Sequence, residues 1–160
     1  MFQPDELLLA LQDANVRFVI IGGVAVAVHG YIRATKDLDI VPDPDSANLV
    51  RLASLLRQIG ATHVGVGDLE ADEFPYDPTD PAQLSQGANF RLDTDLGALD
   101  IMQWVAGLDE DPIYPALAHR AVSVAFRGRP VLVCGLTDLR AMKQAAGRAQ
   151  DLLDLEELGT

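Results

Sequence analysis

Three aspartates stand in apolar segments of the chain, where an acidic side chain is unusual. Asp37 and Asp39 lie two residues apart in "KDLDIV", and Asp100 lies in "ALDIM". Alternate side chains of a β-strand share one face, so Asp37 and Asp39 should point the same way and repel each other. A proton on one carboxylate or a divalent cation between them would relieve this repulsion, and Mg²⁺ and Mn²⁺ prefer such oxygen ligands. We therefore expect these three residues to form a metal site.

A glycine pair precedes these acids in the sequence. Gly22 and Gly23 follow the apolar run "RFVII". Glycines at a turn between a strand and a helix let backbone N–H groups approach a phosphate closely. Two magnesium ions about 4 Å apart can bind the attacking and leaving oxygens of an in-line phosphoryl displacement. Together the glycines and the acids favour phosphoryl transfer, whereas each feature alone also fits an ordinary turn or strand end.

Hydrophobic periodicity assigns these residues to strands, turns and helices. The run before Gly22 is expected to be a buried strand, "VAVAVHG" a short helix that Gly30 ends, and "KDLDIV" a second strand. Apolar residues on one helical face predict a helix from Asp45 to Gly60, with Asp45 or Ser46 as its N-cap. The acids and glycines thus belong to one strand, turn, helix and strand unit.

The remaining segments complete the expected fold. We expect a helix in "PDELLLALQDANV", a strand in "ATHVGV", an irregular connection at 67–87, and β-hairpins in "ANFRLDTDLGALDIMQW" and "AVSVAFRGRPVLVCG". The tail should form two helices that separate near Gly147. Because strands and helices mix without strict alternation, we predict an α/β (α+β) fold with a mixed central β-sheet flanked by helices. The length predicts a single domain over 1–160, with a C-terminal helical segment at about 136–158.

The composition argues against several classes of protein. The formal net charge is −12, with 24 acidic and 12 basic side chains, so a nucleic-acid substrate would need a local basic patch. The single cysteine, Cys134, excludes an internal disulfide, and three histidines at no ligand-like spacing argue against zinc. The longest apolar run is too short to span a bilayer, and the N-terminus lacks the basic region of a signal peptide. We therefore expect a cytoplasmic protein with no membrane partner.

The order of these motifs resembles a known superfamily. "IGG", then thirteen residues, then "DLDI" is similar to the pattern of the nucleotidyltransferase superfamily typified by polymerase β, and Asp100 matches its third acid. More narrowly, three blocks resemble the small bacterial nucleotidyltransferases of the abortive-infection and toxin-antitoxin type. These blocks are "GGVAVAVHGYIRATKDLDI", "NFRLDTDLGALDIM" and "LRAMKQAAGRAQDLLDL". The resemblance extends from Ile21 to Leu155 and implies the nucleotidyltransferase fold.

The resemblance implies roles for the matching positions. It assigns the glycine pair to nucleotide phosphates, Asp37 and Asp39 to the metals, and Asp100 to the second metal and to activation of the acceptor hydroxyl. It also implies nucleotide-binding roles for Arg33, Thr35 and Lys143, and Asp151 lies in a block where these proteins carry a further acid. We add His29 and Arg148 to Asp151 as candidates for additional site residues.

Simpler interpretations exist for the positions outside the acids. His29, next to Gly30, also fits a packed histidine or a helix cap, and Lys143 also fits a solvated helix lysine. Arg148 and Asp151 are three residues apart, which suits a local ion pair on a helix surface.

The function implied is a metal-dependent nucleotidyltransferase. With Mg²⁺ or Mn²⁺ as cofactor, it would move a nucleoside monophosphate from ATP or another nucleoside triphosphate to a hydroxyl acceptor and release pyrophosphate. The acceptor is a tRNA, a protein or a small molecule, and a tRNA end would be bound by Arg140, Lys143 and Arg148. The resemblance also implies a toxin with an antitoxin protein as partner. The alternatives are an inactive nucleotide- or partner-binding module and, less favoured, a D-x-D phosphatase.

Overall fold

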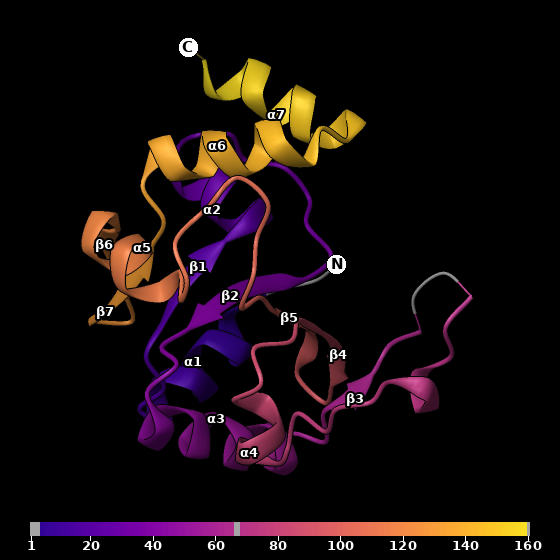
Figure 1. Ribbon diagram of the computed structural model, residues 1–160. Coiled ribbons are helices and arrows are strands. Elements are labelled where there is room, and N and C mark those ends of the chain that lie inside the picture. The colour runs from indigo at the N-terminus through magenta and orange to yellow at the C-terminus, as the bar shows by residue number, and fades with distance from the viewer. Residues whose placement is uncertain (1–3, 66–67, 160) are drawn as a thin grey trace.

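A seven-stranded mixed β-sheet forms the centre of the molecule (Figure 1). The computed structural model describes residues 4–65 and 68–159. The strands are β1 (Phe18–Ile21), β2 (Leu38–Pro42), β3 (Thr62–His63), β4 (Phe90–Thr94), β5 (Gly97–Ile101), β6 (Val122–Phe126) and β7 (Arg129–Val133). The helices are α1 (Asp5–Asp13), α2 (Gly22–Val28), α3 (Ser46–Gln58), α4 (Pro81–Leu84), α5 (Tyr114–Arg120), α6 (Leu136–Ala146) and α7 (Ala149–Leu158), and η1 (Ala71–Glu73) is a 3-10 turn.

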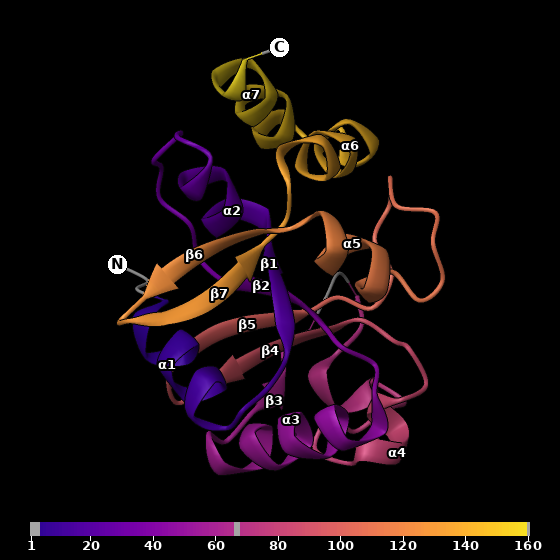
Figure 2. The same cartoon turned by 90° about the vertical axis from the view of Figure 1, so that its left-hand side faces the viewer.

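The strand order is β3-β4-β5-β2-β1-β7-β6. β1 pairs with β7, and β2 with β5, in parallel, and the other pairs are antiparallel. In Figures 1 and 2, α1, α3 and α4 lie at one end of the molecule, and α6 and α7 lie at the other. α2 contacts β1, β2 and α6, which places it between the sheet and the C-terminal helices. The predicted mixed sheet flanked by helices is therefore confirmed.

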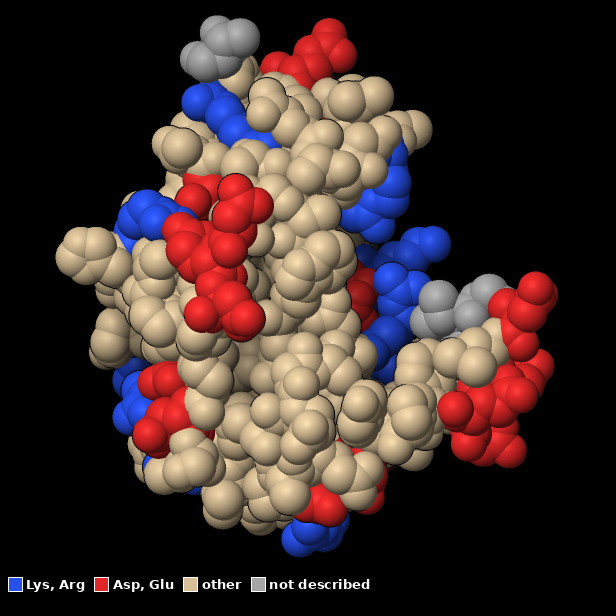
Figure 3. All heavy atoms as spheres, in the orientation of Figure 1, with Lys and Arg blue, Asp and Glu red and all other residues tan. Residues whose placement is uncertain are grey.

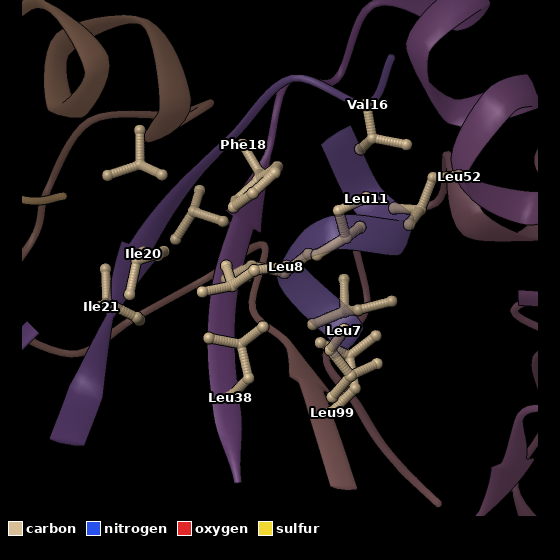
Figure 4. Close-up of a cluster of buried hydrophobic side chains, with 14 of the residues drawn as sticks. Leu7, Leu8, Leu11, Val16, Phe18, Ile20, Ile21, Leu38, Leu52 and Leu99 are labelled. Carbon is tan, nitrogen blue, oxygen red and sulfur yellow. The ribbon is translucent and has the colours of Figure 1, made fainter. Parts of the chain in front are cut away.

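Alternation along β2 separates the core from the acids. Leu38 and Ile40 are fully buried, whereas Asp39 between them is only partly buried. Figure 4 shows Leu38 facing the leucines of α1, among them Leu8. Because neighbouring strand residues point to opposite faces, packing Leu38 against α1 turns Asp39 towards the other face of the sheet.

Several local expectations were incomplete. The helix α5 was not predicted, because seven residues with a proline in the first turn are too short to show helical periodicity. The predicted irregular connection at 67–87 contains η1 and α4, and the predicted strand "ATHVGV" is reduced to the two residues of β3. Residues 66 and 67, at the edges of these two predictions, lie outside the described residues. Gly147, with φ of 61°, separates α6 from α7 as expected. No helix among the described residues is long and apolar enough to cross a membrane.

A buried amide fixes the ends of β1 and β2 to α3. Asn48, in the first turn of α3, is fully buried. Its Oδ1 accepts from the backbone N–H of Arg17 at 2.7 Å, and its Nδ2 donates to the carbonyl oxygens of Arg17 at 3.0 Å and Asp43 at 2.8 Å. Arg17 precedes β1 and Asp43 follows β2, so one side chain ties both strands to the helix.

Removing this amide should destabilise the fold. Asn48→Ala leaves three backbone groups without their partner, and we expect the free energy of unfolding to fall by about 3 kcal/mol. Urea unfolding of this variant and of Ser54→Ala, an exposed position on the same helix, measures the effect. Equal midpoints for the two variants would contradict this account of Asn48.

Candidate active site

Strand register brings the three aspartates together. Asp39 on β2 lies directly opposite Asp100 on the parallel strand β5, and Asp37 comes just before β2. One carboxylate oxygen from each of these residues lies within 4.8 Å of the others. We call Asp37, Asp39 and Asp100 the acid triad. The sheet thus positions three like charges on one face, as their alternation in the sequence predicts.

Burial and mutual repulsion change the acidity of the acid triad. Burial, followed by the charges of Asp37 and Asp100, raises the pKa of Asp39 to about 8. Burial and then Asp37 also raise the pKa of Asp100, to about 6, against an opposing effect of Arg91. At neutral pH the carboxyl group of Asp39 is therefore largely protonated unless a cation compensates the charge at this site.

The donor set fits a divalent cation of the Mg²⁺ or Mn²⁺ type. Its ligands would be carboxylate oxygens, which such hard cations prefer. Asp100 is only 6% exposed, and its Oδ1 is buried without a hydrogen-bond partner among the described residues. A buried oxygen without a donor is costly, and a bound cation would satisfy it. Asp37, Asp39 and Asp100 are the residues that could hold the metal.

The glycine pair lets the chain pass close to the acids. Ile21 at the end of β1 pairs with Asp39, and Gly22 follows it with φ of +70°. A Cβ on Gly22 would collide with Oδ2 of Asp39, and a Cβ on Gly23 would lie 2.7 Å from Oγ1 of Thr35. Thr35 in turn donates to the carbonyl oxygen of Asp37 at 3.2 Å. Both glycines are therefore required where the backbone approaches the acid triad.

A cavity of about 590 Å³ opens above the acid triad and the glycine pair. Five of the 12 basic residues of this acidic chain line it, together with an apolar wall. Figure 3 shows basic side chains gathered around a hollow on the right of the view, with acidic atoms between them. The basic lining residues are Arg33, Lys36, Arg91, Lys143 and Arg148, and the apolar wall is formed by Met102, Val105, Met142 and Ala146.

Two buried acids on α7 hold three of these cations. Asp154, fully buried, accepts from Nε of Arg33 at 2.7 Å and forms an ion pair with Nζ of Lys143 at 2.9 Å. Asp151, 1% exposed, accepts from the same Nζ at 3.1 Å and from Nε of Arg148 at 2.7 Å. Charge-assisted hydrogen bonds of this kind fix both distance and direction. The loop after α2, α6 and the start of α7 are thereby joined at the cavity.

The acidity of Asp154 reflects these bonds. Burial alone would raise its pKa, but hydrogen bonds from Arg33, Lys143 and Gln150 outweigh burial and lower the pKa to about 2. The carboxylate of Asp154 is therefore charged at neutral pH. The simpler interpretations of Asp151 as a helix-surface acid and of Lys143 as a solvated lysine are wrong, because both side chains are buried, although the predicted pairing of Arg148 with Asp151 is present.

The structure brings most of the predicted positions to this cavity. The acid triad, the glycine pair and five further predicted residues line it, the five being Arg33, Thr35, Lys143, Arg148 and Asp151. His29 is not among the lining residues, because its Nε2 donates to the carbonyl oxygen of Cys134 at 2.7 Å and so ties the end of α2 to the end of β7. Arg140 does not line it either, since its guanidinium donates to the carbonyl oxygens of Leu158 and Gly159.

Sequence reasoning missed three residues at the site. Lys36 and Arg91 line the cavity, and Asp154 holds its cations. The predicted hairpin carried a usable signal for Arg91, because a turn at residues 95 and 96 places it directly opposite Asp100. Asp154 had only its spacing of three from Asp151, which does not indicate burial.

The raised pKa of Asp39 predicts a pH effect in the metal-free protein. Its folded value of about 8 exceeds the ordinary 3.8, so the wild type should lose stability as the pH rises from about 4 to 8 and lose no more above that range. Asp39→Asn removes this loss, and we expect it to be more stable than the wild type at pH 8 in EDTA but not near pH 4. Urea unfolding across this range tests the effect against Asp93→Asn, an exposed aspartate of β4. A wild type whose stability rises over the same interval, relative to Asp39→Asn, would refute it.

The buried carboxylate of Asp154 should be essential to the packing of α7. Asp154→Ala leaves the buried Lys143 and the partly buried Arg33 without this partner, and we expect a loss of about 3–5 kcal/mol at neutral pH. Glu157→Ala changes an exposed acid on the same helix and should have little effect. Chemical unfolding of both variants measures the difference, and similar stabilities would show that the network around Asp154 is dispensable.

Comparison with known proteins identifies the fold. No protein-family model and no curated protein sequence matches the chain. The chain is similar to a solved structure described as a candidate nucleotidyltransferase from Thermotoga maritima, with a TM-score of 0.53, 15% identity, and 98% of this chain and 94% of that chain covered. It is also similar to an antigenic nucleotidyltransferase-like protein from Paracoccidioides brasiliensis, with a TM-score of 0.57, 16% identity, and coverage of 96% and 71%. The chain therefore has the nucleotidyltransferase fold.

Proposed function

We propose that the protein is a metal-dependent nucleotidyltransferase. The observation that carries this proposal is the position of the acid triad beside a glycine turn, in one cavity with five cations. Acids alone would fit a metal site, and cations alone would fit an anion site. Their combination suits a nucleoside triphosphate bound with a divalent metal.

The chain's own residues would divide the work of binding. Asp37, Asp39 and Asp100 would hold Mg²⁺ or Mn²⁺, which when bound neutralises phosphate charge and polarises the reacting oxygens. The backbone at Gly22 and Gly23 lines the cavity beside the acid triad and would lie against the phosphates. Arg33, Lys143 and Arg148 would bind the same phosphates, and the buried acids of α7 fix these cations before substrate arrives.

The proposed reaction is an in-line transfer. The acceptor hydroxyl oxygen forms a bond to the α-phosphorus, and the bond from that phosphorus to the bridging oxygen of the β-phosphate breaks. Pyrophosphate leaves, and the hydroxyl proton passes to Asp100. In the metal-free protein, burial and then the charge of Asp37 raise the pKa of Asp100 to about 6.

Other readings have less support. A D-x-D phosphatase would have a Rossmann-like series of parallel strands, whereas β1 and β2 are antiparallel neighbours. An inactive binding module would not need all three acids, and all three are present. A toxin role in the cytoplasm with an antitoxin partner is supported only by the resemblance of the three sequence blocks, and we include it in the proposal on that basis alone.

Binding of metal and nucleotide should stabilise the protein. A ligand at 100 times its dissociation constant adds about 2.7 kcal/mol, which corresponds to several degrees in Tm for a chain of this size. We expect Mg²⁺ or Mn²⁺ to raise Tm, a nucleoside triphosphate to raise it further, and Asp37→Ala combined with Asp39→Ala to abolish both shifts. Asp93→Ala should retain them. An unchanged melting curve of the wild type under all these conditions would contradict metal binding.

The reaction itself can be assayed without knowing the acceptor. Each labelled nucleoside triphosphate is incubated with the protein and the RNA, protein and small-molecule fractions of a cell extract. A transferase labels one fraction and releases pyrophosphate in the same amount, and the Asp37→Ala, Asp39→Ala variant does neither. Release of inorganic phosphate from simple phosphomonoesters would favour the phosphatase, and nucleotide binding without any labelling would favour the binding module.

A further inference from the structure

Four residues form a row across the sheet at the floor of the cavity. Arg91 on β4 pairs with Asp100 on β5, Asp100 pairs with Asp39 on β2, and Asp39 pairs with Ile21 on β1. Gly22 follows Ile21 directly. The row therefore runs from a cation, across two acids, to the glycine turn, and Arg91 and the glycine pair lie on opposite sides of the acids.

The cations of the cavity fall into two groups. Arg33, Lys143 and Arg148 are each bound to a buried acid of α7. Arg91 is different: its Nε lies 3.7 Å from Oδ2 of Asp100, beyond hydrogen-bond distance, and its side chain is 52% exposed. Within residues 4–65 and 68–159 its guanidinium has no hydrogen-bond partner, and the same holds for the ammonium of Lys36. Arg91 thus retains donors for a ligand.

The geometry of phosphoryl transfer assigns a place to each side of the row. In an in-line displacement the attacking oxygen and the leaving group lie on opposite sides of the phosphorus. If pyrophosphate leaves over the glycine turn and the cations held by α7, the acceptor must approach over β5 and β4. Asp100 lies on that side, and its Oδ1 is buried without a partner among the described residues. Arg91 is the next residue of the row beyond it.

We propose that Arg91 forms an acceptor subsite that binds a phosphate group, so that the acceptor is a phosphate-bearing molecule and not a neutral or cationic one. This inference rests on the proposed function, because it uses the direction of transfer. A guanidinium presents paired N–H donors that match phosphate oxygens. Lys36, which also lines the cavity, adds positive charge at the same opening. The chain as a whole carries −12, so recognition of an anion must come from such local groups.

This assignment replaces the expected anchor for a nucleic-acid end. Arg140 lies outside the cavity lining, and Lys143 and Arg148 are assigned to the phosphates of the nucleotide in the proposed function. A phosphate near the reacting hydroxyl occurs at the end of an RNA and in small sugar phosphates. Both sources present the same chemistry to Arg91, and the experiment below separates them.

A binding experiment tests the subsite without requiring catalysis. The wild type, Arg91→Ala and Arg127→Ala are loaded with Mg²⁺ and a non-hydrolysable nucleoside triphosphate analogue. Arg127, an exposed arginine at the turn between β6 and β7, is a matched control outside the cavity. The probes are a fluorescent single-stranded ribo-oligonucleotide with a free 3′-hydroxyl and its uncharged methylphosphonate counterpart, and ribose 5-phosphate and ribose. Affinities for the probes, the analogue and Mn²⁺ are measured separately.

The expected result is specific to the phosphate-bearing probes. Arg91→Ala should bind these probes about tenfold more weakly than the wild type, whereas Arg127→Ala should bind them as the wild type does. For the oligonucleotide, the slope of log K against log salt should fall by about one. Affinities for the nucleotide analogue and for Mn²⁺ should change less than twofold, whereas a residue that only neutralised Asp100 would alter Mn²⁺ binding. A preference for the oligonucleotide over ribose 5-phosphate identifies an RNA end. If Arg91→Ala weakens binding of ribose 5-phosphate as much as binding of the oligonucleotide, the acceptor is a small phosphorylated molecule.

Other outcomes would overturn the subsite. Equal binding of charged and neutral probes by the wild type, or an unchanged affinity of Arg91→Ala for the charged probes, contradicts it even if the nucleotide analogue binds. A wild type that fails to bind the analogue yet binds the charged probes through Arg91 contradicts the proposed function and retains the phosphate subsite. The two proposals therefore fail separately.

Discussion

The repulsion among three carboxylates is the constraint on which the site depends. Asp39 and Asp100 are held opposite each other by the ladder between β2 and β5, and the side chains that flank them are fully buried: Leu38, Ile40, Leu99 and Ile101. The strands cannot slip to separate the charges, because a shift of one residue would turn those apolar side chains out of the core. The stability of the sheet therefore keeps the acids buried and close together, and burial followed by mutual repulsion raises the pKa of Asp39 and Asp100.

The rest of the molecule surrounds this negative centre with ordered charge. Cations line the cavity next to the acid triad, and behind three of them lie the buried carboxylates of Asp151 and Asp154. The carboxylates hold these three cations in place before a ligand binds, so binding does not require the cations to be reordered. α6 and α7 thus contribute to the site although they lie at the end of the molecule away from α1 and α3 (Figure 1).

The sequence predicted those parts of the site that follow from local periodicity. Two acids in alternation on a strand, and a third acid embedded in a hairpin, indicate one face of a sheet, and a glycine pair at the end of a strand indicates close approach of the backbone. The mixed sheet could be predicted because the expected strands and helices do not alternate strictly along the chain. These inferences need only the geometry of single elements and their neighbours in sequence.

The parts that could not be predicted depend on contacts between distant segments. Asp154 resembles other acids of the tail, and its burial depends on partners that include Arg33, 121 residues earlier, and Lys143. In the sequence, Asn48 cannot be told from any other polar residue of a helix. Its role depends on the strand ends at Arg17 and Asp43, which only the fold brings to it. His29 was a candidate site residue because it follows the glycine turn, but its ring donates a hydrogen bond to the carbonyl oxygen of Cys134, just after β7. Tertiary packing determines such partners, and the local sequence pattern does not indicate them.

A crystal structure with Mn²⁺ and a non-hydrolysable nucleoside triphosphate analogue, recorded at the manganese absorption edge, would locate the metal and the phosphates. We expect anomalous density between the carboxylates of Asp37, Asp39 and Asp100, with the phosphates lying over Gly22 and Gly23. Manganese bound elsewhere, or phosphates bound away from the glycine turn, would contradict this expectation.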